Sequence, residues 1–426
     1  MSAMSSRMKL QRDTSLTAES KSGTSSLPNQ ENAPRPSSDL KKAGLEGVIA
    51  ATTALSRSDG EAGRLVYRGY DIHDLARHTT FEEIAHLLWF GHLPTRHELT
   101  SLQKQLATER TIPDYVLALL RDLAQIGRHT TRAVEPMDAL RTALSAWGAS
   151  AIAGKPTIDQ ALAITARLSL FLAAFHRLRH KLEPIEPRPD LDYAANFLYL
   201  LTGELPEERH QQALNAYLVL HADHGMNAST FTARIVASTE ADMASAVVAA
   251  LGALKGPLHG GAPLRVLEML DAIGTLENVE PWLRQAVARG ERLMGFGHRI
   301  YKTEDPRASE LREIARTLDP DRFALAHRVE EGVISLLKEQ KPGRNLYTNV
   351  EFYPVVLLSS MGFPGDLFSP TFAISRIAGW TAHILEQARN NRLIRPEAEY
   401  TGPTSLSFVP LDEREPLLYD VNIQER

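Results

Sequence analysis

Hydrophobic residues recur at a spacing of three and four over most of this chain of 426 residues. Phe81, Ile84, Leu87 and Leu88 show the spacing clearly. Since one turn of an α-helix takes about 3.6 residues, this pattern predicts amphipathic helices from there almost to the C-terminus. Residues 44–69, rich in Gly, Thr, Ser, Val and Ile, instead favour a short strand or two. We therefore predict a mainly α-helical fold.

Glycine and proline mark where several of these helices begin and end. Residues 241–254 are apolar on almost every side, which predicts a helix buried all round, as at a subunit interface. Gly256-Pro257 ends that helix, and Pro263 fits the first turn of the next one. Ser369-Pro370 is predicted to start a later helix, with Ser369 as its cap.

Length, charge and cysteine content narrow the class of protein. A chain of this length can bury a large core, and we predict two domains. A net charge of −5 and a pI near 6.3 give no indication of a nucleic-acid partner or an anionic membrane partner. The absence of cysteine excludes disulfides, thiolate nucleophiles and Cys-ligated zinc. Because no apolar run approaches about 18 residues, no transmembrane span is predicted.

The N-terminal segment has a different composition from the rest. Ten of its first forty residues are serines, and neither a helical nor a strand period is present. It lacks the apolar stretch of a secretory signal, and its acidic residues argue against a transit peptide. We predict that residues 1–42 form a disordered tail and that the protein is cytoplasmic.

Two histidines set among glycines are the first candidates for chemistry. They are His259, in the segment 256–261, and His298, in the segment 295–298. His259 comes just before a predicted helix, whose positive N-terminus disfavours an imidazolium, so we expect a neutral ring. A neutral imidazole can donate to a developing enolate, and the carboxylate of Glu351 can remove a proton. Taken alone, His259 could equally be a surface histidine in a Gly-Pro turn.

His221 and His224 suggest a metal site, because they stand three residues apart with Asp223 between them. A zinc site needs a third and a fourth ligand in suitable geometry. The sequence offers neither, so no metal is predicted.

Taken together, these segments resemble the citrate synthase family, from about Gly44 to Pro403. Five segments carry most of the resemblance, in the family's order and with nearly the family's spacing: 221–227, 256–261, 295–307, 372–379 and 390–396. The shorter segments 69–72 and 136–141 agree as well.

The resemblance implies a mostly α-helical, two-domain subunit that works as a homodimer. Residues 43–260 and 367–426 would form the large domain, and residues 261–366 a small domain that closes over the substrates. It also implies a Claisen condensation of acetyl-CoA with oxaloacetate, as in the tricarboxylic acid cycle, followed by hydrolysis of the thioester. The activity would be that of an acyltransferase.

The resemblance assigns a role to each candidate site residue. Glu351 would be the base, His259 the donor to the thioester oxygen, and His298 the group that polarises the ketone; no metal or other cofactor would be needed. Guanidinium groups grip carboxylates in a bidentate fork, and His and Asn add hydrogen bonds. The oxaloacetate ligands would be His224, Asn227, Arg307, Arg376 and Arg395 of the partner subunit. Ser229 would orient His259, and the coenzyme A candidates are Gly295, Gly297, Arg299, Lys302 and Arg344.

Three positions depart from the family pattern, and three alternative functions stay open. Glu351 stands where the family usually has aspartate, and its extra methylene lengthens the side chain by about 1.5 Å. Pro263 and Glu135 also replace residues that are common in the family. The alternatives are a 2-methylcitrate synthase that uses propionyl-CoA, a citryl-CoA cleaving enzyme, and a non-catalytic paralogue. One methylene in an apolar pocket is worth only about 1–3 kcal/mol, so the first is the closest rival.

Overall fold

The computed structural model describes residues 43–45, 47–126, 132–291, 293–297, 300–340 and 347–414. The chain forms two units, residues 1–52 and 53–426. In the described part of the first unit there is one short 3-10 helix, η1 (Ala43–Leu45). The predicted tail, residues 1–42, lies outside the described residues.

The second unit begins with a small antiparallel sheet in the order β1-β2-β3. Its strands are β1 (Ser56–Asp59), β2 (Arg64–Tyr67) and β3 (Tyr70–Asp71). Ser56 pairs with Tyr67 and Val66 with Asp71. The short strand or two expected within residues 44–69 are therefore present as β1 and β2. Leu65 and Tyr67 are fully buried, since alternate side chains of a strand point to the same face.

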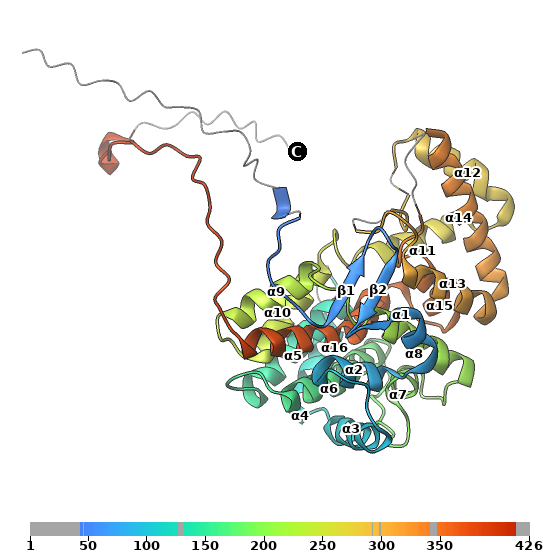
Figure 1. Cartoon of the computed structure of the whole chain (residues 1–426), viewed down its shortest axis with the longest axis horizontal. Helices are drawn as coiled ribbons and strands as arrows, with labels where there is room; N and C mark the ends of the chain where they lie inside the picture. Colours follow the sequence, from blue (N-terminus) through green and yellow to red (C-terminus); the bar gives the residue numbers. More distant parts are fainter. Residues whose placement is uncertain are drawn as a thin grey trace, which may run out of the picture. The chain divides into compact units, whose positions relative to one another are not determined.

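Sixteen α-helices make up most of the described chain, so the prediction of a mainly α-helical fold is confirmed (Figure 1). They are α1 (Ile72–His78), α2 (Phe81–Phe90), α3 (Arg96–Glu109), α4 (Asp114–Ile126), α5 (Pro136–Ala151), α6 (Ile158–Arg179), α7 (Tyr193–Thr202), α8 (Glu208–His221), α9 (Ala228–Ser238), α10 (Met243–Lys255), α11 (Ala262–Ile273), α12 (Val279–Ala288), α13 (Pro306–Leu318), α14 (Pro320–Gln340), α15 (Tyr353–Ser360) and α16 (Phe368–Arg389). The short 3-10 helices η2 (Leu276–Asn278), η3 (Gly365–Leu367) and η4 (Leu411–Glu413) complete the elements.

Most of the predicted helix boundaries hold, and one is wrong. Helix α10 ends at Lys255 with Gly256 as its cap, and Pro263 lies in the first turn of α11. Ser369, however, does not cap a helix, because α16 already begins at Phe368. Its hydroxyl instead donates to the carbonyl of Gly260. Pro370 is tolerated as the third helical residue because the first four N–H groups have no partner within a helix.

Helix α16 forms the centre of the core. It packs against α2, α6, α8, α9 and α10 (Figure 1), and its side chains are buried on all sides. Arg376 is 1% exposed and His383 is fully buried. Buried polar groups need partners or a ligand, so these two side chains point to a site along α16.

Two apolar helices, α6 and α10, bear on predictions made from the sequence. Helix α6 is long and apolar enough to span a membrane, which the sequence criterion missed; however, 78% of its apolar window is buried inside the protein. It packs against α3, α4, α5, α7 and α16 as a core helix. Helix α10 was expected to be buried all round, but Ser245 is exposed and Val248 and Gly252 are partly exposed in this chain.

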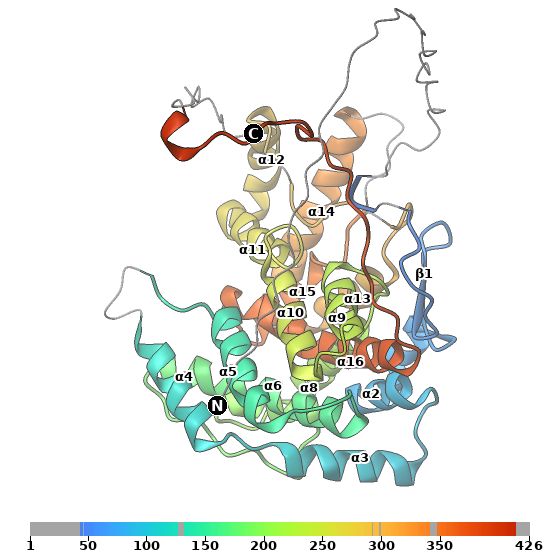
Figure 2. The ribbon, with the colours of Figure 1, turned by 90° about the vertical axis from the view of Figure 1, so that its left-hand side faces the viewer.

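Helices α11 to α15 pack against one another on one side of α16, and α3 and α4 lie on the other side (Figures 1 and 2). These five helices fall in residues 261–366, the predicted small domain. Residues 53–426 form one unit, so the boundary between a large and a small domain stays a prediction.

Candidate active site

The loop between α8 and α9 carries Asn227, the cap of α9. Its Oδ1 accepts hydrogen bonds from the N–H of Thr230 at 3.0 Å and from the hydroxyl of Ser229 at 2.8 Å. These two bonds fix the orientation of the amide. Its Nδ2 is buried and has no hydrogen-bond partner among the described residues. Leaving a buried donor unpaired costs about 1–3 kcal/mol, which points to a ligand with an acceptor at this place.

The same loop is held in position from two sides. The hydroxyl of Tyr67 donates to the carbonyl of Asp223 at 2.8 Å, and the N–H of Gly379 donates to the carbonyl of Ala222 at 3.1 Å. A Cβ at Gly379 would lie 2.3 Å from that carbonyl oxygen. Only glycine therefore allows α16 to approach the loop so closely.

His259 lies in the turn between α10 and α11, where sequence analysis expected it. Its Nε2 is 2.8 Å from Oγ of Ser229, and that oxygen also accepts from the indole N–H of Trp380 at 3.2 Å. Burial, reinforced by the positive charge of Arg376, lowers the pKa of His259 to about 4. The ring is therefore neutral at physiological pH, as expected. Burial is the largest cause of the shift, whereas the prediction relied on the helix N-terminus.

Arg376 lies in the middle of α16. Its Nε donates to the carbonyl of His221 at 2.6 Å, and its guanidinium lies 4.6 Å from the centre of the Phe372 ring. Burial lowers its pKa to about 10, and the charges of Asp223 and Glu351 oppose that shift. It thus remains a cation, and no described Asp or Glu forms an ion pair with it. Since a buried charge needs a counterion, this side chain can bind an anionic ligand.

Arg307 stands at the N-terminus of α13 and is 2% exposed. Its Nε and Nη2 donate to the two carboxylate oxygens of Asp305 at 3.0 and 2.7 Å. Asp305 also caps the helix by accepting the N–H of Arg307. The cap and the bidentate pair hold the guanidinium rigidly. Two of the donors of the Arg307 guanidinium are therefore already bonded to Asp305. Sequence analysis had not assigned Asp305 to the site.

Glu351 precedes α15, and its charge interacts with those of Arg307 and Arg376. Burial raises its pKa to about 7, although the charges of Arg307 and Arg376 oppose this shift. Its N–H donates to Oδ1 of Asn349 at 2.9 Å, and Asn349 Nδ2 donates to the carbonyl of Gly297 at 3.0 Å. A carboxyl group that titrates near neutral pH can serve as a proton acceptor there.

The segment that leads to His298 runs beside the segment that leads to Glu351. Phe296 forms an antiparallel bridge with Thr348. His298 itself, with Arg299 and Arg344, lies outside the described residues. Gly295 has a φ of +86°, and a Cβ there would lie 2.7 Å from Phe352. This close packing is a structural reason for the first glycine of the motif.

His224 and Lys302 lie in different surroundings. Nε2 of His224 is 3.1 Å from the hydroxyl of Tyr301, and both residues are buried. The ammonium group of Lys302 instead pairs with Glu61 in the β1–β2 turn, and both side chains are exposed. The structure therefore gives Lys302 a partner away from the residues around Arg376.

Arg395 is not brought to this site within one chain. It is exposed, and the N–H of its neighbour Ile394 donates to Oγ of Ser238 at 3.0 Å. Ser238 ends α9, whereas Asn227 caps its start. Eleven helical residues span about 16 Å. Arg395 therefore lies at the end of α9 opposite the candidate site.

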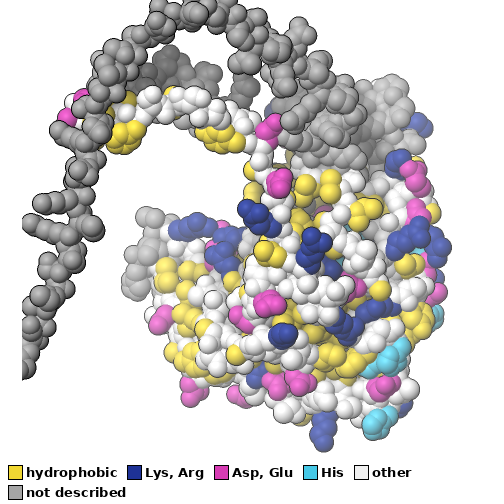
Figure 3. All heavy atoms as spheres, turned by 60° about the vertical axis from the view of Figure 1, so that its left-hand side comes forward, with side chains coloured by type: hydrophobic (Ala, Val, Ile, Leu, Met, Phe, Trp, Pro, Cys, Tyr) yellow, Lys and Arg dark blue, Asp and Glu magenta, His cyan; other side chains and the backbone are white. Residues whose placement is uncertain are grey.

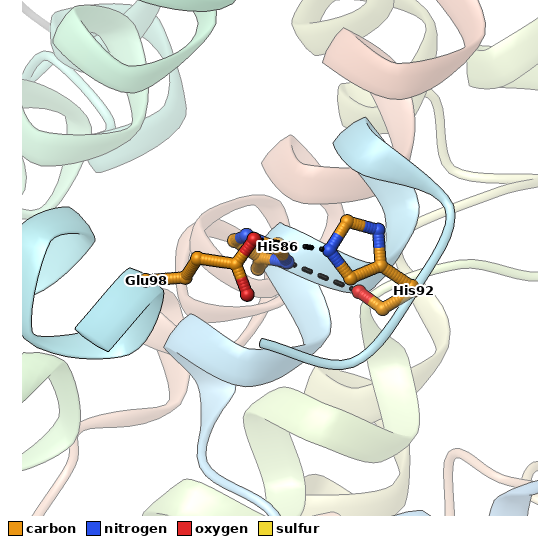
Figure 4. A group of neighbouring side chains, drawn as sticks. All are labelled: His86, His92 and Glu98. Carbon is orange, nitrogen blue, oxygen red and sulfur yellow. Dashed lines mark hydrogen bonds and ion pairs between the residues drawn. The ribbon is translucent and has the colours of Figure 1, made fainter. Parts of the chain in front are cut away.

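One group of described residues, His86, His92 and Glu98, has ligand atoms that all lie within 4.8 Å of one another (Figure 4). Glu98 accepts the N–H and hydroxyl of Thr95 at 2.7 and 2.8 Å, as the partner in a capping box. His92 Nε2 is 3.2 Å from Glu98, and His86 donates to the carbonyl of His92. Helix capping accounts for this arrangement. His221 and His224 do not belong to the group.

Sequence reasoning missed several residues that surround the site. Asp305 and Tyr301 stand in a segment that carried the resemblance, and the Asp-Pro pair at 305–306 was a cap signal for Asp305. Burial raises the pKa of Tyr217, and the nearby charge of Glu351 raises it further. No local pattern pointed to Tyr217, because it comes from the preceding helix α8.

Comparison with known proteins identifies the relatives of this chain. The family model described as "Citrate synthase, C-terminal domain" matches residues 44–397. "Citrate synthase 2" of Bacillus subtilis is 45% identical over 381 residues, which cover 87% of this chain and 98% of the relative. "2-methylcitrate synthase" of Mycobacterium tuberculosis is 40% identical over 375 residues, covering 85% and 91%. The solved structure of a ternary complex of carboxymethyl coenzyme A and oxaloacetate with citrate synthase from Thermoplasma acidophilum matches with a TM-score of 0.79 and 34% identity. The match covers 87% of this chain and 98% of that one.

Proposed function

This chain belongs to the citrate synthase family and is an acyl-transferring enzyme, and from that premise we propose that it condenses acetyl-CoA with oxaloacetate. Hydrolysis of the resulting citryl-CoA would yield citrate and CoA. The observation that carries the proposal is the buried cation of Arg376, which forms no ion pair with a described Asp or Glu and lies close enough to Glu351 for their charges to interact. A substrate with two carboxylates would supply an ion-pair partner for Arg376.

The proton transfer rests on Glu351 and His259. The methyl protons of a thioester are weakly acidic, so a base must act together with a donor at the thioester oxygen. Glu351, with a pKa near 7, would take the proton. Since Nε2 of His259 is held by Ser229, Nδ1 is the nitrogen left to donate to the enolate. That role requires the Ser229 hydroxyl, which has one hydrogen, to donate to Nε2 in place of Oδ1 of Asn227.

Oxaloacetate would lie between α9, α13 and α16. Arg376 and Arg307 would hold its carboxylates, and the unpaired Nδ2 of Asn227 would donate to it. His224 would add a further hydrogen bond. By resemblance, His298 would polarise the ketone and protonate the new alkoxide. No metal or other cofactor enters this proposal, because imidazole and guanidinium donors stabilise the developing charges.

The coenzyme A chain would cross the turns 256–261 and 295–302. Gly295, Gly297, Arg299, Lys302 and Arg344 remain the candidates for this role. Lys302 would have to leave Glu61 to reach a phosphate. The small domain, residues 261–366, would close over both substrates by a hinge motion.

We propose a homodimer in which Arg395 of the partner subunit completes each site. The distance along α9 supports this, because Arg395 cannot reach the site of its own chain. Residues 391–410 form neither helix nor strand, and they include Leu406 and Phe408, 82% and 84% exposed. Both belong to the segment that follows α16 (Figure 1), and Figure 3 shows exposed hydrophobic side chains along it. A second copy of the chain would cover them and the open face of α10. A cytoplasmic location is part of the same proposal.

The second candidate is a 2-methylcitrate synthase, which the Mycobacterium tuberculosis relative favours. Propionyl-CoA adds one methylene to the acyl group, and the same base and donor would act on it.

A free-thiol release assay with oxaloacetate and either acetyl-CoA or propionyl-CoA tests both candidates. Acetyl-CoA should give the higher kcat/KM. A higher value with propionyl-CoA would select the second candidate. No thiol release with either substrate from folded protein would refute both.

A further inference from the structure

Two buried ionisable side chains remain outside the chemistry proposed above. Asp223 and His383 are both fully buried, and Nε2 of His383 lies 3.2 Å from Oδ1 of Asp223. They come from the α8–α9 loop and from α16, 160 residues apart in sequence. Sequence analysis had given a role to neither of them.

The direction of this hydrogen bond follows from its neighbours. Nη1 of Arg234 lies 3.1 Å from Nδ1 of His383 and 2.7 Å from a carboxylate oxygen of Glu386. A guanidinium can only donate, so Nδ1 of His383 accepts. Nε2 must then carry the hydrogen that is donated to Asp223. Arg234 thus sets the tautomer, and the contact with Asp223 has a fixed direction.

The second carboxylate oxygen of Asp223 binds the loop to the sheet. It accepts the hydroxyl of Ser56, which begins β1, and the N–H of Gly225 at 3.3 Å. Ser56 in turn accepts the N–H of Gly225 at 3.0 Å. One carboxylate therefore fixes the loop to α16 on one side and to β1 on the other. The next residues along the loop are His224 and Asn227, both proposed to bind oxaloacetate.

Asp223 and His383 are a poor choice for a purely structural role. Burying a carboxylate costs several kcal/mol per ion, and apolar side chains of similar volume often stabilise a core equally well. The charge of Asp223 also opposes the effect of burial on the pKa of the neighbouring Arg376. The pair is therefore linked to the substrate-binding groups through both the backbone and the local charge.

We propose that Asp223 and His383 are positioning residues that hold His224 and Asn227 in the geometry that binds oxaloacetate. This inference rests on the proposed function. Loss of the pair would move the loop relative to Arg376 and Arg307. It would weaken oxaloacetate binding much more than acyl-CoA binding, because His259 lies in a separate turn.

Three variants test the proposal in the full-length protein by steady-state kinetics. Asp223→Asn and His383→Leu should raise KM for oxaloacetate about 10- to 100-fold, since misplacement by about 1 Å has effects of that size. KM for acetyl-CoA at saturating oxaloacetate should change less than about threefold. His383→Gln, whose amide can replace the Nε2–H donor, should restore most of the affinity.

Glu82→Gln is the matched control. Glu82 is a carboxylate that is 1% exposed, and it accepts the N–H of Tyr193 at 2.8 Å. Gln keeps an acceptor for that N–H, so the variant should fold and leave KM for oxaloacetate unchanged. If KM rises equally in Glu82→Gln and Asp223→Asn, the contact between Asp223 and His383 only stabilises the fold, and the proposal is overturned.

The test also covers variants that do not fold and a wild-type protein that is inactive. If Asp223→Asn or His383→Leu does not fold, Ser56→Ala removes one donor to Asp223 with less disturbance and should still raise KM for oxaloacetate. An unchanged KM in folded Asp223→Asn, or in folded Ser56→Ala when the other variants do not fold, would overturn the inference. If the wild-type protein releases no thiol, the proposed function fails, and calorimetric binding of oxaloacetate to the same variants then tests the positioning role alone.

Discussion

Nε2 of His259 lies 2.8 Å from Oγ of Ser229. Ser229 is fully buried, and its oxygen also contacts Oδ1 of Asn227 and the indole N–H of Trp380. A single hydroxyl thus joins the proposed thioester donor to a proposed oxaloacetate ligand. The orientation of the His259 ring depends on this contact because its other ring nitrogen has to face the substrate.

Replacing Ser229 by alanine should lower kcat about 10- to 100-fold, because the His259 ring loses the contact that orients it. The variant should also lose about 1–3 kcal/mol of stability, since the indole N–H of Trp380 is left without an acceptor. Thiol-release kinetics and thermal unfolding measure the two effects. Ser169→Ala, which removes another buried hydroxyl in α6, is the control and should keep the wild-type kcat. Equal kcat values for both variants would contradict the orienting role.

The pH dependence of the reaction should report Glu351. Burial raises the pKa of this carboxyl to about 7, and only the ionised form can accept a proton. We expect kcat/KM for acetyl-CoA to rise as the pH increases towards about 7 and then to level off, because this ratio follows the free enzyme. A profile that stays flat well below neutral pH would show that another group is the base.

The same carboxyl should make the protein less stable as the pH rises. Burial raises its pKa from the ordinary value near 4.5 to about 7, so the folded state favours the protonated form. The contribution of this carboxyl to stability is therefore largest below about pH 4.5, falls as the pH rises to about 7, and is constant above. Glu351→Gln removes this loss, which is on the order of 3 kcal/mol. Thermal unfolding should show the variant more stable than wild type at pH 8 and equal to it in acid, while its turnover is abolished.

Local patterns account for the parts of this fold that could be predicted from sequence. The spacing of Phe81, Ile84 and Leu88 depends only on the helix that contains them, and α2 forms there. Ser369 shows where such reasoning fails. Its hydroxyl bonds to Gly260, which is 109 residues away in sequence, and no local pattern records that contact.

In the candidate site too, some features could be predicted from local sequence and others depend on residues distant in sequence. His259, Ser229 and Asn227 could be named because they stand in segments that resemble a known family. The pKa of Glu351 depends on burial by elements that are distant in sequence, so its value near 7 could not be inferred from Asn349-Val350-Glu351 alone. Likewise the ion pair of Lys302 with Glu61 joins residues 241 apart. The sequence also does not show that Arg395 and Asn227 lie at opposite ends of α9.

Replacing Gly379 by alanine should weaken oxaloacetate binding. The added Cβ would lie 2.3 Å from the carbonyl oxygen of Ala222 and 2.6 Å from Oδ1 of Asp223, so the loop must move away from α16. We expect KM for oxaloacetate to rise about tenfold or more. Gly148→Ala is the matched control, because its Cβ would crowd Ala244 at 2.4 Å and not the loop. It should lose about 1–3 kcal/mol of stability and keep the wild-type KM; a raised KM in both variants would contradict the local explanation.

Mixed dimers should show whether Arg395 completes the site of the partner subunit. Arg395→Ala and Glu351→Gln should each be nearly inactive alone at low oxaloacetate. In a mixed dimer, one site combines the intact Glu351 of the first chain with the intact Arg395 of the second. Random mixing of equal amounts should therefore recover about a quarter of the wild-type activity, since half the dimers are mixed and each has one complete site. Thiol release after unfolding and refolding the two variants together measures this recovery. Separately refolded samples combined afterwards serve as the control, and no recovery in the co-refolded sample would place Arg395 outside the partner's site.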